Sequence, residues 1–146
     1  MVRQVVTIPQ ITMSGINHKK IAIFACFDPE DRVGLVDRSI EIKFLVREVY
    51  GKPQWKLAQL YLDYEGNLPL AERKTYQDFL KDAMEGKFDI LYMWSLRQLS
   101  LDAGEIKPLL EHLRKYRITL RTHIEEFDTS VISDNLILDI WAAGQK

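Results

Sequence analysis

The side chains of this sequence that could do chemistry gather in four short segments, each directly after an expected strand. These segments are 26–29, 63–67, 95–100 and 123–126. The first holds the single cysteine, Cys26, which is a nucleophile type but has no histidine near it in sequence to activate it. We expect Cys26 to be a small buried residue at a strand end. The last holds Glu125 and Glu126, which could act as general acid and base, although the solvated end of a strand explains two carboxylates as well.

Metal and nucleotide sites find no support in the sequence. His18, His112 and His123 are far apart and lack the spacing of metal ligands. A single cysteine excludes a structural zinc site made of several cysteines. The chain contains neither GxGxxG nor GxxxxGK(S/T), the glycine-rich patterns that cradle nucleotide phosphates. We therefore expect no metal ion and no cofactor.

The four segments require a scaffold that brings the ends of successive strands together. Short apolar, β-branched runs predict strands, and apolar residues at helical spacing among charges predict helices. The expected strands are 21–27, 55–63, 88–94 and 118–122, and the expected helices are 34–50, 71–85, 103–116 and one capped by Ser133 or Asp134. This alternation predicts an α/β domain of three layers, with a central, mostly parallel sheet of four to five strands and helices on both faces. In such sheets, ligand groups lie beyond the carboxyl ends of the strands.

Length and composition suit one ordinary domain of 146 residues. Residues 1–18 are expected to form an N-terminal arm with a short strand at 5–8, and residues 19–146 to form the domain. The net charge of −1 argues against binding nucleic acid or acidic membranes by bulk charge. No apolar run approaches the roughly 18–20 residues that span a bilayer, no signal peptide is evident, and a lone cysteine suits a reducing compartment. We therefore predict a cytoplasmic protein without membrane contact.

Seven further segments of the sequence indicate a family when their order and spacing along the chain are considered together. They are 20–25, 39–41, 60–66, 72–80, 85–91, 94–101 and 125–129, and they follow the lead VRQVVTIPQI. Over residues 20–143 the chain resembles the catalytic domain of the serine recombinases, the family of resolvases, invertases and large serine integrases. The segment 60–66, for example, is similar to the family's Tyr-x-Asp-x-Gly, and 85–91 to its Gly-Lys-Ile-Asp turn and strand. The resemblance implies a resolvase-like fold.

The resemblance also implies a chemistry, which depends on a few positions. In the family, a serine hydroxyl attacks a DNA phosphodiester, and arginines neutralise the oxygens of the transition state. In this chain the nucleophile position falls on Asp28, and the strand arginine two residues earlier falls on Cys26. In the third-strand motif the acidic position is Arg97, and the two arginine positions are Gln98 and Leu101. The reacting positions are therefore replaced.

Other family positions are partly retained. Asp63 and Arg73 match the family, while the glutamine of the first long helix falls on Lys43. The replaced positions together are more negative than the family pattern, which weakens phosphate binding. Attack by Asp28 would give an acyl phosphate, which hydrolyses too readily to survive strand exchange. We expect no catalytic residue in this degenerate site, and we hypothesise that Asp28 and Arg97 form an ion pair that fills the former pocket.

The resulting hypothesis is a pseudoenzyme, a serine-recombinase-like domain that acts as a protein-interaction or regulatory partner in DNA recombination, phage or mobile-element biology. Its partner would be a second copy, giving a homodimer, or a recombinase-like protein in a hetero-complex, and its own DNA binding would be weak or absent. We expect the last helix to be truncated at Lys146, without the DNA-binding domain that follows it in the family. The apolar residues of this helix could pack on their own domain or on a second subunit. These are Ile132, Leu136, Ile137, Ile140 and Trp141.

Two alternatives stay open. The first is an active site-specific DNA recombinase that uses a serine outside the aligned position. The candidates are Ser14, Ser39, Ser95 and Ser100. The second is a metal-dependent enzyme in which Asp28, Asp63 and Glu125 hold magnesium, since three carboxylates can bind this ion.

Overall fold

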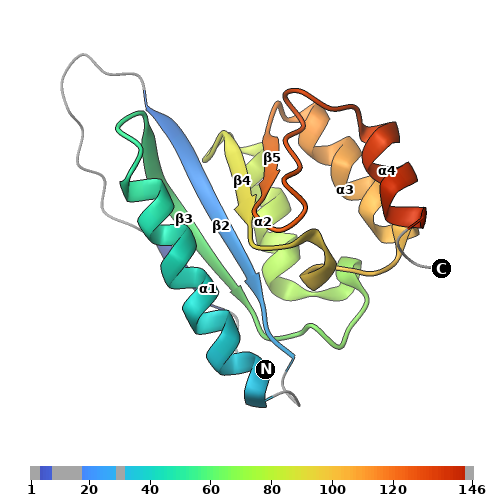
Figure 1. Ribbon diagram of the computed structural model, residues 1–146, viewed down its shortest axis with the longest axis horizontal. Coiled ribbons are helices and arrows are strands. Elements are labelled where there is room, and N and C mark those ends of the chain that lie inside the picture. The colour runs from blue at the N-terminus through green and yellow to red at the C-terminus, as the bar shows by residue number, and fades with distance from the viewer. Residues whose placement is uncertain (1–3, 8–17, 29–31, 144–146) are drawn as a thin grey trace.

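The computed structural model describes residues 4–7, 18–28 and 32–143 and has alternating strands and helices (Figure 1). The strands are β1 (Gln4–Thr7), β2 (Lys19–Cys26), β3 (Trp55–Asp63), β4 (Ile90–Met93) and β5 (Thr119–Thr122). The helices are α1 (Arg32–Tyr50), α2 (Lys74–Met84), α3 (Ala103–Lys115) and α4 (Asp134–Ala143). Two 3-10 turns, Leu70–Glu72 and Leu96–Gln98, lie before α2 and α3. The eight elements expected from the sequence pattern are all present, so that prediction is confirmed.

The sheet is mostly parallel, as expected, and has the strand order β1-β3-β2-β4-β5. Strands β2, β3, β4 and β5 are parallel to one another, and β1 pairs with β3 in the antiparallel direction. The strand expected at 5–8 is found at Gln4–Thr7, and Ile8 lies outside the described residues. At the opposite edge the chain after β5 folds back, so that Arg121 and Asp128 form an isolated antiparallel bridge.

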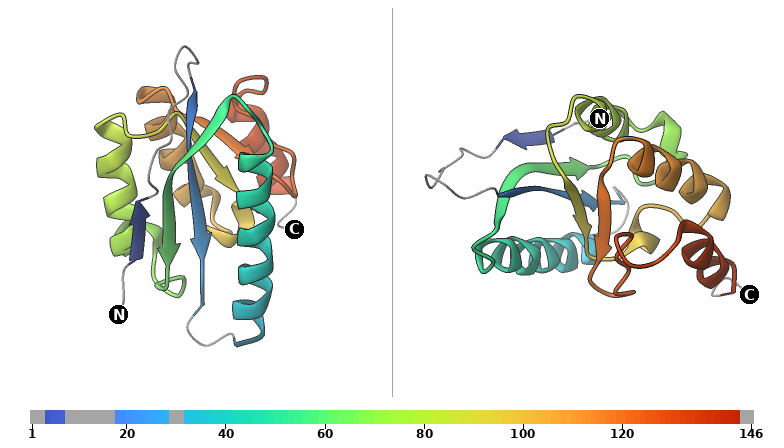
Figure 2. Two further views of the ribbon diagram at one scale, coloured as in Figure 1. Left: turned by 90° about the vertical axis from the view of Figure 1, so that its left-hand side faces the viewer. Right: turned by 90° about the horizontal axis from the view of Figure 1, so that it is seen from above.

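Helix α1 covers one face of the sheet through apolar residues in its second half. Leu45 and Val49 are buried there against Ile21 and Ile23 of β2 and Leu57 of β3. Helices α2 and α3 cover the other face, and α4 packs on α3 (Figure 2). The domain therefore has the three layers that the pattern predicted.

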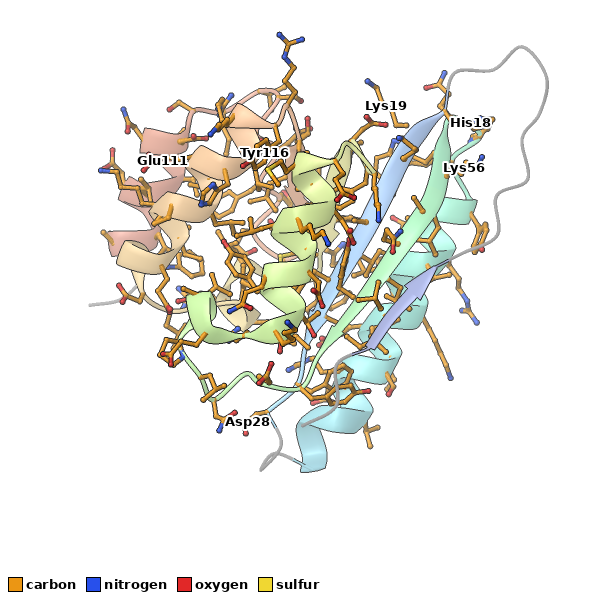
Figure 3. All side chains as sticks on the ribbon, turned by 180° about the vertical axis from the view of Figure 1, so that it is seen from behind. His18, Lys19, Asp28, Lys56, Glu111 and Tyr116 are labelled. Carbon is orange, nitrogen blue, oxygen red and sulfur yellow. The ribbon has the colours of Figure 1, made fainter. Side chains whose placement is uncertain are left out.

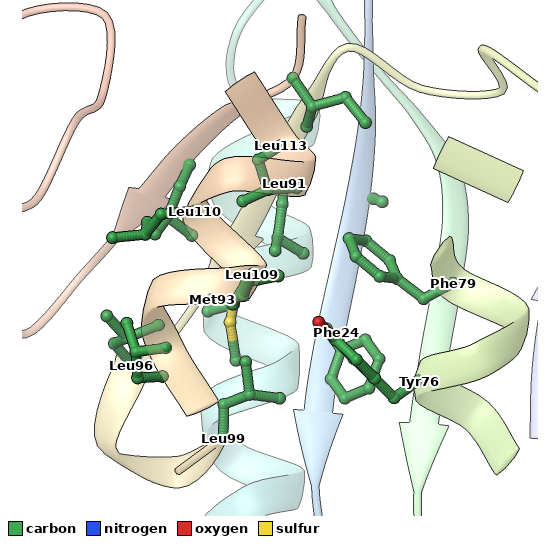
Figure 4. Close-up of a cluster of buried hydrophobic side chains, with 14 of the residues drawn as sticks. Phe24, Tyr76, Phe79, Leu91, Met93, Leu96, Leu99, Leu109, Leu110 and Leu113 are labelled. Atoms are coloured by element: carbon green, nitrogen blue, oxygen red, sulfur yellow. The ribbon is translucent and has the colours of Figure 1, made fainter. Parts of the chain in front are cut away.

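The larger core lies between the sheet and the α2–α3 layer (Figure 4). The ring of Phe79 contacts the rings of Phe24 and Tyr61 edge to face, with centroids 5.6 and 5.5 Å away. On α3, Leu109 and Leu113 are buried against the same layer. Such aromatic and leucine burial is the main favourable term for folding, and it fixes α2 and α3 relative to the strand ends.

Two helix starts follow the expected capping chemistry, and one differs. The Asp102 carboxylate accepts a hydrogen bond of 2.8 Å from the Gly104 amide, and the Ser133 hydroxyl accepts one of 3.2 Å from the Leu136 amide. Helix α2 begins at Lys74, so the expected start at 71 is wrong. Arg73 is extended, with ψ 127°, and it separates the 3-10 turn from the helix.

The carboxyl ends of β2, β3 and β4 lie at one end of the sheet. Asp28, just after β2, is at the opposite end of the molecule from His18 and Lys19 (Figure 3). Among the described residues, no helix has the length and apolar character needed to cross a membrane.

Candidate functional site

A cleft of about 550 Å³ opens at the carboxyl end of β2, and we call it the site cleft. It is formed by the residues after β2, the loop after β3, the start of α2, and the segment that joins β4 to α3. Its lining is Cys26, Phe27, Asp28, Arg38, residues 66–69, Arg73, residues 97–102 and Glu105. Six of the seven site positions named from the sequence lie in this lining, and the seventh, Asp63, is fully buried next to it.

Arg73 is buried, and its guanidinium is engaged by the protein itself. Only 4% of its surface is exposed. It donates hydrogen bonds to three backbone carbonyl oxygens, those of Leu68 (2.8 Å), Leu99 (2.8 Å) and Gly66 (3.3 Å). Its Nη1 also lies 3.5 Å from Oδ2 of Asp63. Arg73 therefore ties the loop after β3 to the segment before α3.

Cys26 and Asp63 form a buried pair next to Arg73. The Cys26 Sγ lies 3.9 Å from Oδ2 of Asp63 and 4.0 Å from Nη1 of Arg73. Burial is the main reason that the pKa of the Cys26 thiol lies well above its usual value, and the Asp63 carboxylate raises that pKa further. Burial also raises the pKa of Asp63, while the Glu65 amide and Arg73 oppose the shift. Cys26 is thus buried at a strand end, as the sequence predicted, and its raised pKa keeps the thiol protonated.

The segment after β4 brings Arg97, Gln98 and Leu101 to the cleft. The Arg97 guanidinium carbon lies 5.2 Å from the centroid of the Trp141 ring, within the range of a cation–π contact. The Gln98 side chain donates a hydrogen bond of 2.8 Å to Glu41 of α1. Leu101 is 60% exposed. Asp28 and Arg97 both line the cleft, and an ion pair between them stays a prediction.

Arg38 is a cleft residue that the sequence analysis missed. It lies in the first half of α1, and it binds Glu41 through Nε (2.6 Å) and Nη2 (3.2 Å). Because Glu41 also accepts from Gln98, these three side chains join α1 to the segment before α3. The signal was present as an Arg–Glu pair three residues apart on a helix, but only the fold places Arg38 beside Arg73 and Arg97.

A close backbone approach explains the glycine of the loop after β3. A Cβ atom at Gly66 would lie 2.8 Å from the carbonyl oxygen of Phe27, and the Gly66 amide donates to that same oxygen. The rings of Phe27 and Tyr64 stack with centroids 4.8 Å apart. These contacts hold the loop against the end of β2, which gives the cleft one fixed wall.

The structure does not bring together the three carboxylates of the magnesium alternative. Glu125 accepts hydrogen bonds from the Ser95 hydroxyl and the Leu96 amide, so it holds the turn after β4. Among the described residues, no group of three or more acidic, histidine or cysteine side chains is arranged to hold a metal ion. Asp28, Asp63 and Glu125 are all described, so this alternative is wrong. The acid–base hypothesis for Glu125 and Glu126 also loses support, because Glu126 is exposed and does not line the cleft.

The candidate serines differ in their placement. Ser14 lies outside the described residues, Ser39 is exposed on α1, and Ser95 is bound to Glu125. Ser100 lines the site cleft, where its hydroxyl donates to Glu105 (2.7 Å) and accepts from the Asp102 amide (3.0 Å). It therefore stabilises the turn before α3.

Comparisons with known proteins place the chain in a family. The model of the Resolvase N-terminal domain matches residues 38–146. The N-terminal catalytic domain of TP901-1 integrase is similar, with a TM-score of 0.67 and 22% identity, and covers 87% of this chain and 94% of that one. A resolvase family site-specific recombinase from Streptococcus pneumoniae has a TM-score of 0.66 and 12% identity over 87% of this chain and 85% of that one.

A third solved structure agrees with these two. The C-terminal catalytic domain of ISC1926 TnpA, an IS607-like serine recombinase, has a TM-score of 0.61 and 15% identity over 83% of this chain and 77% of that one. No curated protein sequence gives a significant match. The chain belongs to the resolvase N-terminal domain family, and its fold is that of a serine recombinase catalytic domain. The resemblance read from the sequence is confirmed.

Proposed function

We propose that this chain is a catalytically degenerate serine-recombinase-like domain, which acts as a protein-interaction or regulatory partner in DNA recombination or mobile-element biology. The engagement of Arg73 carries the proposal. Its guanidinium is 4% exposed and is bound to three carbonyl oxygens and to Asp63, so the arginine that the sequence retains serves the fold. Phosphoryl transfer needs such donors directed at the phosphate oxygens.

The chemistry of the strand end supports the same proposal. The position of the attacking hydroxyl holds Asp28, whose carboxylate would repel a phosphodiester. Cys26 stands at the position where the family has an arginine, so the positive charge of that arginine is missing here. The thiol is buried and its pKa is raised, so it does not supply a thiolate at neutral pH either. Arg38 and Arg97 do line the cleft, but Arg38 is bound to Glu41, and Asp28, Asp102 and Glu105 add negative charge to the same lining.

We further propose a cytoplasmic location, weak or absent DNA binding by this chain, and a partner that is a second copy or a recombinase-like protein. The net charge of −1 supports weak DNA binding. The family, and the description of similar structures as an integrase and site-specific recombinases, support the context of DNA recombination.

A covalent trapping assay tests the degenerate site. The chain is incubated with nicked suicide duplexes, and an active serine recombinase with its own site serves as positive control. We expect no protein–DNA adduct on a denaturing gel. An adduct that disappears in Ser100→Ala would establish the alternative, an active recombinase, because Ser100 is the candidate serine that lines the cleft.

The regulatory role needs a separate test. Strand exchange by the active recombinase of the same host is measured with increasing amounts of this chain. We expect its rate to change until the partner is saturated, and the two proteins to co-elute. An unchanged rate at a large excess, without co-elution, would refute the proposed role even if the site is inactive.

A further inference from the structure

A groove lies between α2 and α3, and its walls are largely apolar. We call it the α2–α3 groove, and its volume is about 240 Å³. Leu70 and Leu80 line it from the turn before α2 and from α2, and Pro108 lines it from α3. It belongs to the layer opposite α1 (Figure 2), and Glu105 is the one described residue that it shares with the site cleft. An apolar cavity of about 150 Å³ already accepts benzene, so this groove has room for a substituted aromatic ring.

The hydroxyl of Tyr76 is a polar group of this groove that lacks a partner. Only 5% of the surface of Tyr76 is exposed, and its ring lies between α2 and α3 (Figure 4). Within the described part of the chain, the hydroxyl makes no hydrogen bond. Burial and the Glu105 carboxylate raise the pKa of Tyr76 to about 12, so the hydroxyl keeps its proton. Because buried polar groups in native proteins nearly always have a hydrogen-bond partner, this hydroxyl indicates a ligand atom at the groove.

A second polar group without its usual partner follows from Pro108, which lies inside α3. Proline has no N–H, so the carbonyl oxygen of Gly104, four residues earlier, lacks the donor that the next turn of a helix supplies. Gly104 and Pro108 both line the groove, and Gly104 is exposed. A carbonyl oxygen can only accept, so a ligand that satisfies it must carry an N–H or O–H donor.

The charges of the groove indicate a neutral ligand. Among the described residues that line it there is no lysine or arginine, so an anion would find no cationic partner of that kind. Glu105 supplies the one carboxylate. Its two oxygens already accept hydrogen bonds from the Leu70 amide (2.6 Å) and the Ser100 hydroxyl (2.7 Å), so this carboxylate holds the turns at that end of the groove.

We propose that the α2–α3 groove binds a small, neutral aromatic molecule of the phenol type. The ring packs against Leu80 and Pro108, a hydroxyl hydrogen is donated to the Gly104 carbonyl oxygen, and a ligand oxygen accepts from the Tyr76 hydroxyl. Each of these three features answers one property of the groove: its apolar walls, its missing helix donor and its unpaired hydroxyl. The site depends neither on the chemistry of the site cleft nor on the proposed function.

A titration of the full chain with p-cresol, followed by ¹H–¹⁵N NMR spectra, tests the proposal. We expect saturable shifts of the Leu80, Gly104 and His112 amides, all of residues that line the groove. The dissociation constant should be millimolar or tighter, as expected for a ligand with so few atoms. The matched probe is 4-methylanisole, in which a methyl group replaces the hydroxyl hydrogen. It cannot donate, and it should bind about threefold to tenfold more weakly, which corresponds to the loss of one hydrogen bond.

Two conservative variants separate the two polar groups. Pro108→Ala supplies the missing N–H to the Gly104 carbonyl, so it should weaken p-cresol binding to the level of 4-methylanisole and leave 4-methylanisole binding unchanged. Tyr76→Phe keeps the ring and removes the hydroxyl, so it should weaken both probes about threefold to tenfold, because each carries an acceptor oxygen. Pro53→Ala and Tyr116→Phe make the same exchanges outside the groove, and they should change neither affinity.

Both groove variants should remain folded, because Pro108→Ala favours the helix and Tyr76→Phe keeps the buried ring. Thermal unfolding of each variant checks this. A spectrum without saturable shifts at the groove amides would overturn the proposal. Equal affinities for p-cresol and 4-methylanisole would also overturn it, and so would affinities that neither Pro108→Ala nor Tyr76→Phe changes, since the probe would then bind elsewhere.

Discussion

Replacing Arg73 by alanine should destabilise the domain by about 3–5 kcal/mol, the usual cost of removing one partner from a buried ion pair. The structure gives two reasons. Asp63 is fully buried and would lose its cationic partner at 3.5 Å, and three carbonyl oxygens would lose their donor. Against a total stability of about 5–15 kcal/mol this loss is large. Urea denaturation followed by tryptophan fluorescence should show the midpoint fall by about 1–3 M.

The control for this measurement is Arg97→Ala, which removes an exposed arginine from the same cleft. It should cost no more than about 1 kcal/mol, because Arg97 is exposed, and the interactions of exposed charged side chains contribute about that much or less. Arg73→Lys should be nearly as damaging as Arg73→Ala, since an ammonium cannot reproduce the planar set of donors. If Arg73→Ala proves no more destabilising than Arg97→Ala, Arg73 is not the tie between loops that we infer.

The pH dependence gives the same variant a second readout. Burial raises the pKa of Asp63 in the folded state, so the folded state holds its proton more tightly, and stability falls as the pH rises from the unfolded to the folded pKa. Arg73 opposes that shift, and its removal should therefore raise the folded pKa further. The cost of Arg73→Ala should be larger at about pH 8 than at about pH 5. A cost that is equal at both pH values would mean that the Asp63 charge does not contribute.

Three further predictions concern single residues around the cleft. The Cys26 thiol should react with a thiol-specific reagent at least about tenfold more slowly in the native than in the urea-unfolded protein, because burial raises its pKa and hides the sulfur; equal rates would contradict the buried placement. Gly66→Ala should lower stability by about 1–3 kcal/mol through the contact of its Cβ with the Phe27 carbonyl, whereas Asn67→Ala, next to it and exposed, should have little effect on the thermal midpoint. Asp102→Ala should lower the free energy of unfolding by about 1 kcal/mol, because it removes the side chain that caps α3. Asp102→Asn should keep most of the wild-type stability in thermal unfolding, because the asparagine oxygen can accept the same hydrogen bond.

The sequence predicted the scaffold well because its signals are local. The apolar run 21–27 and the capping residue Ser133 each reflect a rule that acts over a few residues. The start of α2 was misplaced because the extended backbone at Arg73 is imposed by distant contacts, among them the carbonyl of Leu99. A rule of local spacing contains no information on such a contact.

The candidate site likewise contains residues whose placement could be predicted from the sequence and residues whose placement could not. The ends of parallel strands meet by topology, so Cys26, Asp28 and Asp63 could be placed together from the sequence. The presence of Arg38 in the cleft could not be predicted, because it depends on how α1 lies across the sheet. The role of Glu125 in holding the turn after β4 could not be predicted from the sequence either, since its hydrogen bond with Ser95 joins residues 30 positions apart.

The bridge between Arg121 and Asp128 and the pairing of β1 with β3 have a practical consequence for anyone who shortens this protein. The short strand β1 covers the outer edge of the longer strand β3, and the segment that folds back after β5 covers part of the outer edge of β5. An uncovered strand presents unpaired amides and carbonyls that recruit other chains into aggregates. A version lacking the first seven residues would leave β3 as such a template, so solubility tags belong ahead of β1 rather than in its place.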